Sequence, residues 1–398
     1  MQETGSLTSP PQARHYGMDW LRIAAFVLLI LYHIGFMFTP WGYQTPSRGV
    51  VEGVDVLLLA LSPWRLSLLF AISGYSSAAM LERRQGVGVF FRSRVTRLAV
   101  PLIFGILVIV PPQPWVGAMR DTGYTGSYLT FLTNDYSLFQ NVNGIPVPRW
   151  IHLWFVAYLL VYTGVLCALM QLPETVKSRF KRGFEWVLAG PLFLPLPVAF
   201  LFCIRLLGNG WTDTHQLVDD LAAHAHYLPM FLFGVLLRQS PALLEAIRRQ
   251  WRIALVTAAI GYGVIVACKM AFPGEALLPA RIEPLFSAAK ALLGWSAIVA
   301  LFGIAGRYWN HDAPIRAALV EAVFPFYIIH QTLYIGAGWW LNDFGLGALG
   351  EFLVLVAATS IGCVAFYLLG REIAPLRPLI GLGPDRRQRA RVPNPATA

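Results

Sequence analysis

Asp19–Thr39 reads DWLRIAAFVLLILYHIGFMFT, an apolar run long enough to cross a bilayer as a helix. Its interior is interrupted by Arg22 and His33, which are eleven residues apart. That spacing is three helical turns plus roughly 20°, so both side chains lie on one face, roughly 16 Å apart along the axis. The structural alternative is a snorkelling arginine and a histidine satisfied by a neighbouring helix. Because ionisable groups at membrane depth are costly, the shared face favours a functional site.

Composition indicates an integral membrane protein. Hydrophobic residues make up 56% of the 398, charged residues only 13%, and the mean hydropathy is +0.57. A soluble domain carries about twice this share of charge. Residues 1–18 are polar and lack a basic segment, and no small-residue cleavage site follows the first apolar run. We therefore expect a short cytoplasmic N-terminal tail and a retained first helix, not a signal peptide.

Apolar segments of spanning length predict an all-α polytopic membrane protein with about ten transmembrane helices in one domain, residues 19–370. After the first come Val54–Met80, Leu98–Val116, Trp150–Gln171, Phe184–Leu207, His226–Leu237, Ile253–Phe272, Leu285–Ala305, Ala317–Ile335 and Leu346–Gly370. The sixth is short, but its flanks, Leu221–Ala225 and Arg238, could extend it to a full crossing. Residues 371–398 form a basic cytoplasmic tail.

Membrane topology explains the net charge of +10 better than a nucleic-acid partner does. If successive loops alternate between the two sides, one set of loops holds most of the basic residues, within 83–97, 177–182, 238–252, 307–316 and the C-terminal tail. The other set holds little beyond Arg48, Arg120, Arg149 and Arg281. Because cytoplasmic loops are enriched in Lys and Arg, both termini are predicted to be cytoplasmic. The bilayer is the expected partner, and nucleic acid is not.

The second predicted span carries Arg65 near its middle, where an unpaired guanidinium would be costly. Arg65 therefore needs a partner, and Asp19 and Asp55 are the nearest acidic side chains by span. Ser73 and Gly74 follow on the same helix. Small residues of this kind allow close approach of either a second helix or a ligand, and the sequence leaves both open.

Arg94 and Arg97 are neighbours at i, i+3 on a helix that leads into the third span. The planar, permanently charged guanidinium suits phosphate recognition. A cytoplasmic loop of a membrane protein would also be rich in arginine, so this cluster has two interpretations.

Three histidines fall in the outer half of the membrane under the predicted topology: His33, His152 and His330. The remaining five are interpreted as ordinary surface residues: His15, His215, His224, His226 and His311. The four cysteines lie in apolar spans at unrelated spacings and are expected to be buried hydrophobes: Cys167, Cys203, Cys268 and Cys363. No metal-ligand pattern is present, so no metal is expected.

Five short motifs occur along the chain in a fixed order. They are Arg22-x10-His33, Phe70-Ala71-Ile72-Ser73-Gly74-Tyr75, Arg94-x-x-Arg97-Leu98 with Pro101, His152-Leu153-Trp154-Phe155, and Phe326-Tyr327-Ile328-Ile329-His330. In this order the chain, over roughly Asp19–Gly370, resembles the bacterial membrane acyltransferase family three. Pro63-Trp64-Arg65 resembles the branch with the periplasmic glucan succinyltransferases.

The resemblance implies a multi-pass enzyme of the bacterial inner membrane that moves an acyl group from cytoplasmic acetyl-CoA or succinyl-CoA to a hydroxyl of a glycan or other extracytoplasmic acceptor. It implies that His33 is a general base or a transient acyl carrier, with Arg22 and Arg65 orienting it or stabilising the oxyanion. The donor side would comprise Arg92, Arg94, Arg97, Ser73 and Gly74. The acceptor side would comprise His152, Trp154, Tyr327 and His330.

Two other functions are compatible with part of the sequence. A secondary transporter of a small anionic or polar solute also buries Arg and His, but the sequence shows no inverted repeat and no paired broken helices. A different multispanning acyltransferase class would use His330 as its sole catalytic residue. An assay of thiol release from acyl-CoA distinguishes a transporter from an acyltransferase. Single substitutions at His33 and His330 distinguish the two acyltransferase schemes.

Overall fold

The structure is a computed structural model that describes residues 15–40, 47, 49–83, 86–142, 144–208, 214–273 and 278–383. Most of the predicted N-terminal tail, the end of the C-terminal tail, Arg48 and Arg84 lie outside the described residues.

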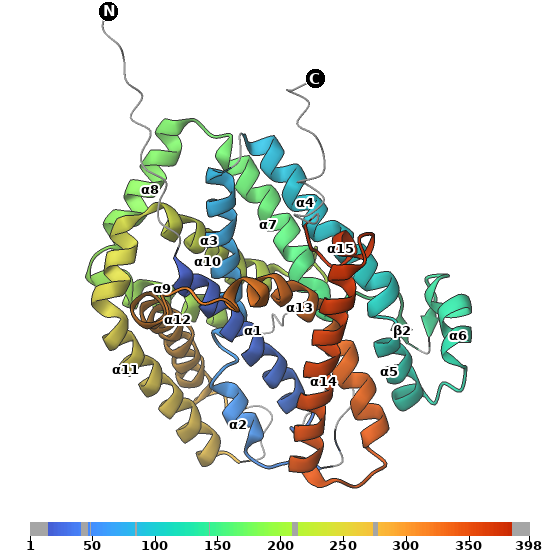
Figure 1. Ribbon diagram of the computed structural model, residues 1–398. Helices are drawn as coiled ribbons and strands as arrows, with labels where there is room; N and C mark the ends of the chain where they lie inside the picture. The colour runs from blue at the N-terminus through green and yellow to red at the C-terminus, as the bar shows by residue number, and fades with distance from the viewer. Residues whose placement is uncertain are drawn as a thin grey trace, which may run out of the picture.

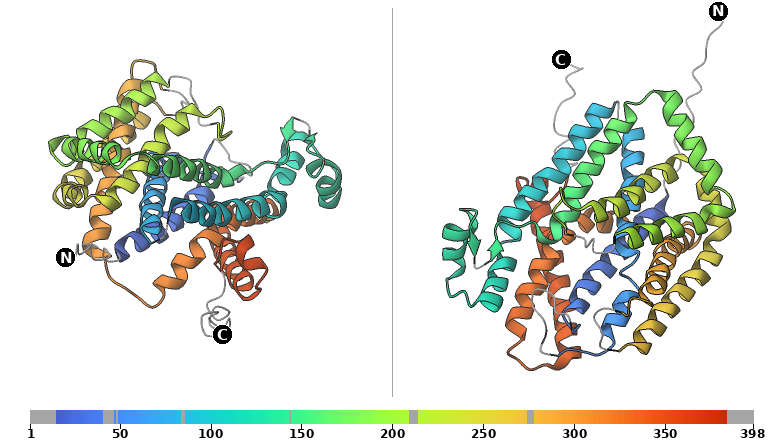
Figure 2. Two further views of the ribbon diagram at one scale, coloured as in Figure 1. Left: turned by 90° about the horizontal axis from the view of Figure 1, so that it is seen from above. Right: turned by 180° about the vertical axis from the view of Figure 1, so that it is seen from behind.

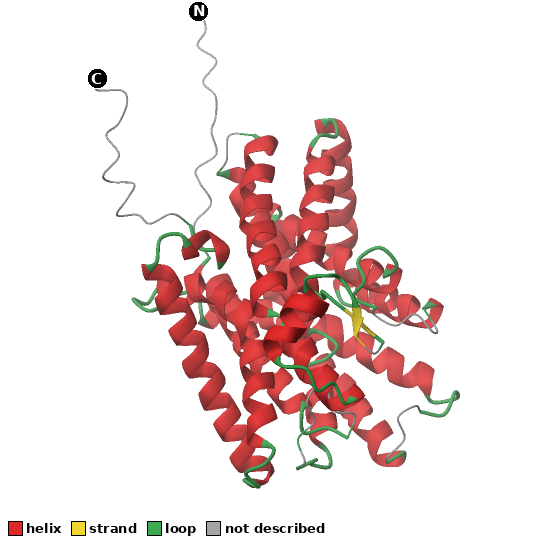
Figure 3. Cartoon of the chain, turned by 90° about the vertical axis from the view of Figure 1, so that its right-hand side faces the viewer, coloured by secondary structure: helices red, strands yellow, loops and turns green. Residues whose placement is uncertain are grey.

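Helices make up nearly all of the regular structure in these ranges (Figure 3). The α-helices are α1 (Tyr16–Phe36), α2 (Val54–Leu59), α3 (Arg65–Glu82), α4 (Val87–Phe104), α5 (Pro112–Thr122), α6 (Tyr128–Thr130), α7 (Trp154–Met170), α8 (Glu174–Leu188), α9 (Pro195–Leu207), α10 (Leu221–Gln239), α11 (Pro241–Ala271), α12 (Glu283–Tyr308), α13 (Arg316–Leu341), α14 (Gly347–Glu372) and α15 (Leu376–Leu379). Short π or 3-10 turns are η1 (Gly105–Ile109), η2 (Phe131–Tyr136), η3 (Ile151–Leu153) and η4 (Pro191–Phe193). Strands β1 (Asn141–Val142) and β2 (Ile145–Pro146) pair antiparallel, with Asn141 opposite Pro146.

Seven helices in the described part of the chain are long and apolar enough to cross a membrane, and two bent helix pairs raise the number to nine. The seven are α1, α7, α10, α11, α12, α13 and α14. The protein is therefore an all-α, multi-pass membrane protein, as predicted. In Figure 1 the α3–α4 and α7–α8 connections lie at the upper end of the bundle, and the α11–α12 and α13–α14 connections lie at the lower end. This is the alternation that the basic residues predict, with the arginine-rich side uppermost.

Three predicted spans are broken rather than continuous, and one of them, Leu98–Val116, is bent by 42° between η1 and α5. The second divides into α2 and α3, because turns follow Leu59 and Pro63 cannot continue a helix. Arg65 is consequently the first residue of α3, not a residue of a helix middle. The predicted fifth span fails in a similar way, because α8 and η4–α9 meet at 94° across Gly190 and Pro191. In contrast, α10 begins at Leu221 and takes in the flanks proposed for the short sixth span.

Helix α1 lies in the interior of the helix bundle, between α3, α12 and α13 (Figures 1 and 2). Its buried leucines and alanine, Leu21, Ala25 and Leu29, recur at four-residue intervals, so one stripe of the helix is buried along its length. Arg22 and His33 lie on the same side of α1 as this stripe, so their side chains also point toward the interior of the bundle. The helix starts at Tyr16, three residues before the predicted domain boundary.

The sequence did not predict the structure of two peripheral parts of the chain. Residues after α5 project from one side of the bundle (Figure 2) and have a small core of their own, including Phe131 and Tyr136. The start of the predicted C-terminal tail is instead part of the folded domain. Ile380 and Leu382 are buried against Ala322 and Tyr367, and α15 packs on α4 and α14.

Candidate active site

Two histidines from opposite ends of the chain form a hydrogen-bonded pair. Nδ1 of His33, near the end of α1, lies 3.1 Å from Nε2 of His330 on α13. Their rings are stacked with centroids 5.3 Å apart. Nδ1 of His330 lies 2.8 Å from the backbone oxygen of Tyr327, one turn earlier on α13. His330 is fully buried, whereas His33 is only partly buried.

This arrangement determines which nitrogen of His33 is basic. A backbone carbonyl can only accept, so His330 must carry its hydrogen on Nδ1 and present a lone pair on Nε2. The Nδ1–H of His33 then donates to that lone pair, and Nε2 of His33 carries the lone pair of a neutral imidazole. The pair therefore fixes His33 in the tautomer that a general base needs.

A third imidazole lies next to this pair. The ring of His152 is edge-on to that of His330, with centroids 5.3 Å apart. Its Nε2 donates to the backbone oxygen of Ile328 at 2.9 Å, so Nδ1 carries a lone pair. That nitrogen is buried and has no hydrogen-bond partner within the described residues. The hydroxyl of Tyr327 donates to the backbone oxygen of His152 and fixes it to α13.

Arg65 supplies the positive charge at this end of the site. Its guanidinium lies over the ring of Tyr32 on α1, with the central carbon 3.4 Å from the ring centroid. Only 6% of Arg65 is exposed, and its Nε and Nη1 are buried without a partner in the described part of the chain. Because Arg65 opens α3, the positive end of that helix adds to the local potential. A buried cation with donors to spare is a site for negative charge.

These groups line one cavity of about 180 Å³. Its wall also includes Trp154 and Tyr327, which were predicted on the acceptor side, and Gln331, which was not. His33, Arg65 and His152 all reach the cavity, but His330 does not line it. The expectation that His330 lines the acceptor side is therefore corrected: it lies behind His33 and contacts it directly.

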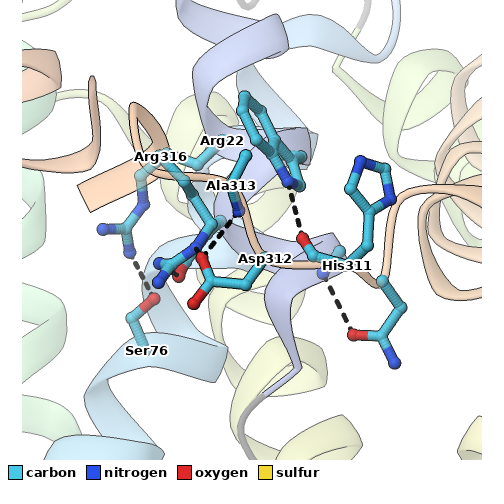
Figure 4. A network of polar contacts seen from close by, with 10 residues as sticks. Arg22, Ser76, His311, Asp312, Ala313 and Arg316 are labelled. Atoms are coloured by element: carbon cyan, nitrogen blue, oxygen red, sulfur yellow. Dashed lines mark hydrogen bonds and ion pairs between the residues drawn. The ribbon is translucent and has the colours of Figure 1, made fainter. Parts of the chain in front are cut away.

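The predicted ion-pair partners of Arg65 are wrong. Asp19 pairs instead with Arg316, at 2.5 Å. Arg316 is also 2.7 Å from Asp312 (Figure 4). Asp55 forms no ion pair with Arg65 within the described residues. The first turn of α1 is thus held by the α12–α13 connection and the start of α13, not by the second span. Arg65 instead lines the cavity.

Arg22 was expected to act together with His33, but it lies away from the cavity. Its Nη2 donates to the hydroxyl of Ser76 on α3 (Figure 4), and it does not line the cavity with His33. Arg22 lies close enough to Arg94 for their charges to interact, as does Arg97. Nε of Arg94 is buried without a partner among the described residues. Three guanidiniums therefore gather near the start of α1, and we call Arg22, Arg94 and Arg97 the arginine cluster.

Three other residues expected on the donor side lie differently. Arg92 is exposed on α4, and the charges that act on Arg94 are those of Arg22 and Arg97. A Cβ at Gly74 would lie 1.9 Å from the backbone oxygen of Phe231, and one at Gly234 would lie 1.9 Å from that of Ala71. Gly74 therefore lies at a close crossing of α3 and α10, which supports the packing alternative for this segment.

The interpretation as surface residues needs correction for His215, His224 and His226, whereas His311 is exposed as predicted. His215 stacks on Trp154, with centroids 4.2 Å apart, and lines the cavity. His226 contacts the hydroxyl of Ser67 at 2.9 Å, and His224 contacts that of Tyr162 at 3.1 Å. Sequence spacing could not reveal these contacts, because the partners are 61 to 159 residues away along the chain.

The cysteines and the metal prediction can be compared with the structure. Cys167, Cys268 and Cys363 are buried as expected, whereas Cys203 is exposed on α9. Within the described ranges, no group of three or more His, Cys, Asp or Glu side chains has the arrangement of a metal site.

A family model described as an acyltransferase domain, that of acyltransferase family three, matches residues 15–368. The chain belongs to this family. This membrane acyltransferase therefore has both the arginine cluster and the histidine cavity inside the family domain, near opposite ends of α1. Comparisons with curated proteins and with solved structures gave no match.

Proposed function

We propose that this acyltransferase transfers an acetyl or succinyl group from acyl-CoA to a hydroxyl of a glycan or other extracytoplasmic acceptor, with His33 as the general base. One observation carries the proposal: a single cavity contains the partly buried His33, with its basic Nε2, and a buried arginine with unused donors. A base beside a preformed site for negative charge is what acyl transfer to a hydroxyl requires.

The proposed step follows from these positions. The acceptor oxygen attacks the thioester carbonyl carbon while Nε2 of His33 takes the hydroxyl proton. The carbonyl electrons move onto oxygen, and the free N–H groups of Arg65 stabilise the resulting oxyanion. When the carbon–sulfur bond breaks, the imidazolium of His33 returns its proton to the thiolate. The products are the acceptor ester and CoA, and His33 is neutral again.

His152 supports the acceptor side of this scheme. Its Nδ1 lone pair can accept a hydrogen bond from the incoming hydroxyl, and Trp154 and Tyr327 give the cavity apolar walls. A cavity of about 180 Å³ suits an acyl group together with one hydroxyl-bearing group of the acceptor, so the rest of the acceptor would remain outside.

The arginine cluster supports an acyl-CoA donor. Like charges so close together repel one another, and an anion with several phosphates would relieve that repulsion by bidentate hydrogen bonds. The cluster and His33 are separated by roughly three turns of α1, or roughly 16 Å. An extended pantetheine arm could cover that distance. In this proposal the CoA phosphates bind on the arginine-rich side, which would be the cytoplasmic side of an inner membrane.

Neither rival function accounts for the same features as well. The family match does not favour a transporter. A scheme with His330 as sole catalytic residue conflicts with its position, because it is fully buried, does not line the cavity, and has both ring nitrogens in hydrogen bonds.

The proposal is tested by free-thiol release from acetyl-CoA and succinyl-CoA by the purified protein, with and without glucose oligosaccharides. We expect release by the wild type and none by His33→Ala. His311→Ala is the matched control, because His311 is an exposed histidine near the opposite end of α1. A fully active His33→Ala would contradict the role of His33. A wild type that neither releases thiol nor binds CoA would contradict the donor class.

A further inference from the structure

The loop Thr214–Asp220, between α9 and α10, adds a residue to the cavity that the family motifs do not contain. We propose that His215 is an acceptor-binding residue, which hydrogen-bonds the acceptor and directs its hydroxyl toward His33. This inference rests on the proposed function, because it assigns the acceptor side of the same cavity.

His215 reaches the cavity from a part of the chain remote from the other walls. Its ring stacks on Trp154 at 4.2 Å with an angle of 19° between the planes. Trp154 begins α7, and α7 ends at the connection to α8 on the arginine-rich side. The loop therefore lies at the end of α7 that is away from the cytoplasmic connections. A substrate group entering here would come from the acceptor side.

The backbone of His215 is held in an unfavourable conformation. Its φ is +57°, in the left-handed region that histidine adopts less readily than glycine. Three contacts impose this conformation: the amide donates to Asp220 Oδ2 at 2.8 Å, the carbonyl accepts from Trp150 Nε1 at 2.8 Å, and the ring lies on Trp154. Strain of this kind persists where surrounding structure over-determines it, and it is concentrated at functional sites.

Asp220 is the anchor of the loop. Its side chain is almost fully buried and also accepts from the hydroxyl of Tyr158 at 2.5 Å and, at the start of α10, from the amide of Ala223. Burial acts to raise the pKa of Asp220, but these hydrogen bonds outweigh it and hold the pKa below its usual value. The carboxylate is therefore ionised at neutral pH, and it fixes the loop through charge-assisted bonds.

The chemistry of the loop fits a hydroxyl-rich acceptor better than the acyl-CoA donor. An imidazole can both donate and accept, as a sugar hydroxyl can, and the neighbouring indole rings offer apolar faces. The arginines that suit phosphate lie at the other end of α1. His215 and His152 would then hold the acceptor from two sides while His33 removes its proton.

The test uses the purified full-length protein with the better of acetyl-CoA and succinyl-CoA and a panel of hydroxyl acceptors from glycerol to glucose oligosaccharides. His215→Gly removes the imidazole and suits the left-handed backbone, so the fold should be retained. We expect the acceptor KM to rise about tenfold, the loss of roughly one hydrogen bond. The donor KM should change little, because the arginines proposed to bind the donor lie at the other end of α1.

Gln216→Ala is the matched control, because Gln216 is exposed in the same loop. His215→Asn tolerates the same backbone and keeps a hydrogen-bonding group, so it should recover part of the acceptor affinity. An unchanged acceptor KM in His215→Gly, while His33→Ala is inactive, would overturn this inference and leave the proposed function intact. A wild type that transfers to none of the acceptors would overturn the proposed function, and the inference with it.

Discussion

The two ends of α1 carry polar groups of opposite character. Near its start, Arg22 joins Arg94 and Arg97 in a group of like charges, while Asp19, which pairs with Arg316, also lies close enough for its charge to act on Arg22. Near its end, His33 is hydrogen-bonded to His330, and His330 and the neighbouring His152 each donate to a backbone oxygen. We propose that the first arrangement binds an anion, whereas the hydrogen bonds of the second assign the hydrogens of its imidazoles.

The difference suggests a division of labour along one helix. A group of neighbouring guanidiniums is suited to binding an anion, because the anion reduces the repulsion between the guanidiniums at every stage of the reaction. A fixed tautomer beside a buried cation acts on the transition state, because the charges it meets appear only as the reaction proceeds. Substitutions at the two ends should therefore differ in whether they alter kcat or KM.

The largest effect is expected for His33→Ala. Loss of a general base should lower kcat by about 10²–10⁴-fold, while the KM for acyl-CoA stays near the wild-type value. Steady-state thiol release at saturating and limiting donor measures both constants. A large rise in donor KM with kcat retained would make His33 a binding residue and remove the distinction between the two ends.

Arg65→Met should lower kcat by about 10²–10³-fold, as loss of an oxyanion donor does. It should also stabilise the protein by about 1–3 kcal/mol, because buried donors without partners are removed. Thermal unfolding in detergent, measured beside activity, tests the two effects together. A variant that is both less active and less stable would indicate that Arg65 is structural.

His330→Ala should lower kcat by roughly 10–100-fold, which is the usual cost of removing a group that orients an imidazole. His330→Gln should recover part of this loss, because its side-chain oxygen can accept from Nδ1 of His33. A purely structural role would show equal losses in the two variants, and complete inactivity of both would favour His330 as a catalytic residue in its own right.

The smallest effect is expected at the other end of the helix. Arg94→Gln should raise the KM for acyl-CoA about tenfold with little change in kcat, because one charge-assisted contact is lost. Raising the salt concentration should weaken donor binding less in this variant than in the wild type. Arg248→Gln is the control, since Arg248 pairs with Glu245 on exposed α11 surface. An unchanged KM in Arg94→Gln would move the donor phosphates elsewhere.

The sequence predicted the fold class because long apolar runs have few other stable structures in lipid. It was less successful where the backbone turns inside an apolar segment. The α8–α9 break at Gly190–Pro191 and the α2–α3 break at Pro63 both contain helix-breaking residues, but the hydropathy continues through them. Whether an apolar segment bends at such a residue depends on how the surrounding helices pack against it.

For the site, the helical period alone put Arg22 and His33 on one face of α1, and residue chemistry alone singled out Arg65, His152 and His330. Only the tertiary structure decided which of them meet. His33 and His330 are 297 residues apart, and His215 enters from a third segment. The tautomer of His33 depends further on a backbone oxygen, that of Tyr327, which side-chain identity does not encode. Spacing fixes direction along one helix, whereas hydrogen bonds between helices depend on how all of them pack.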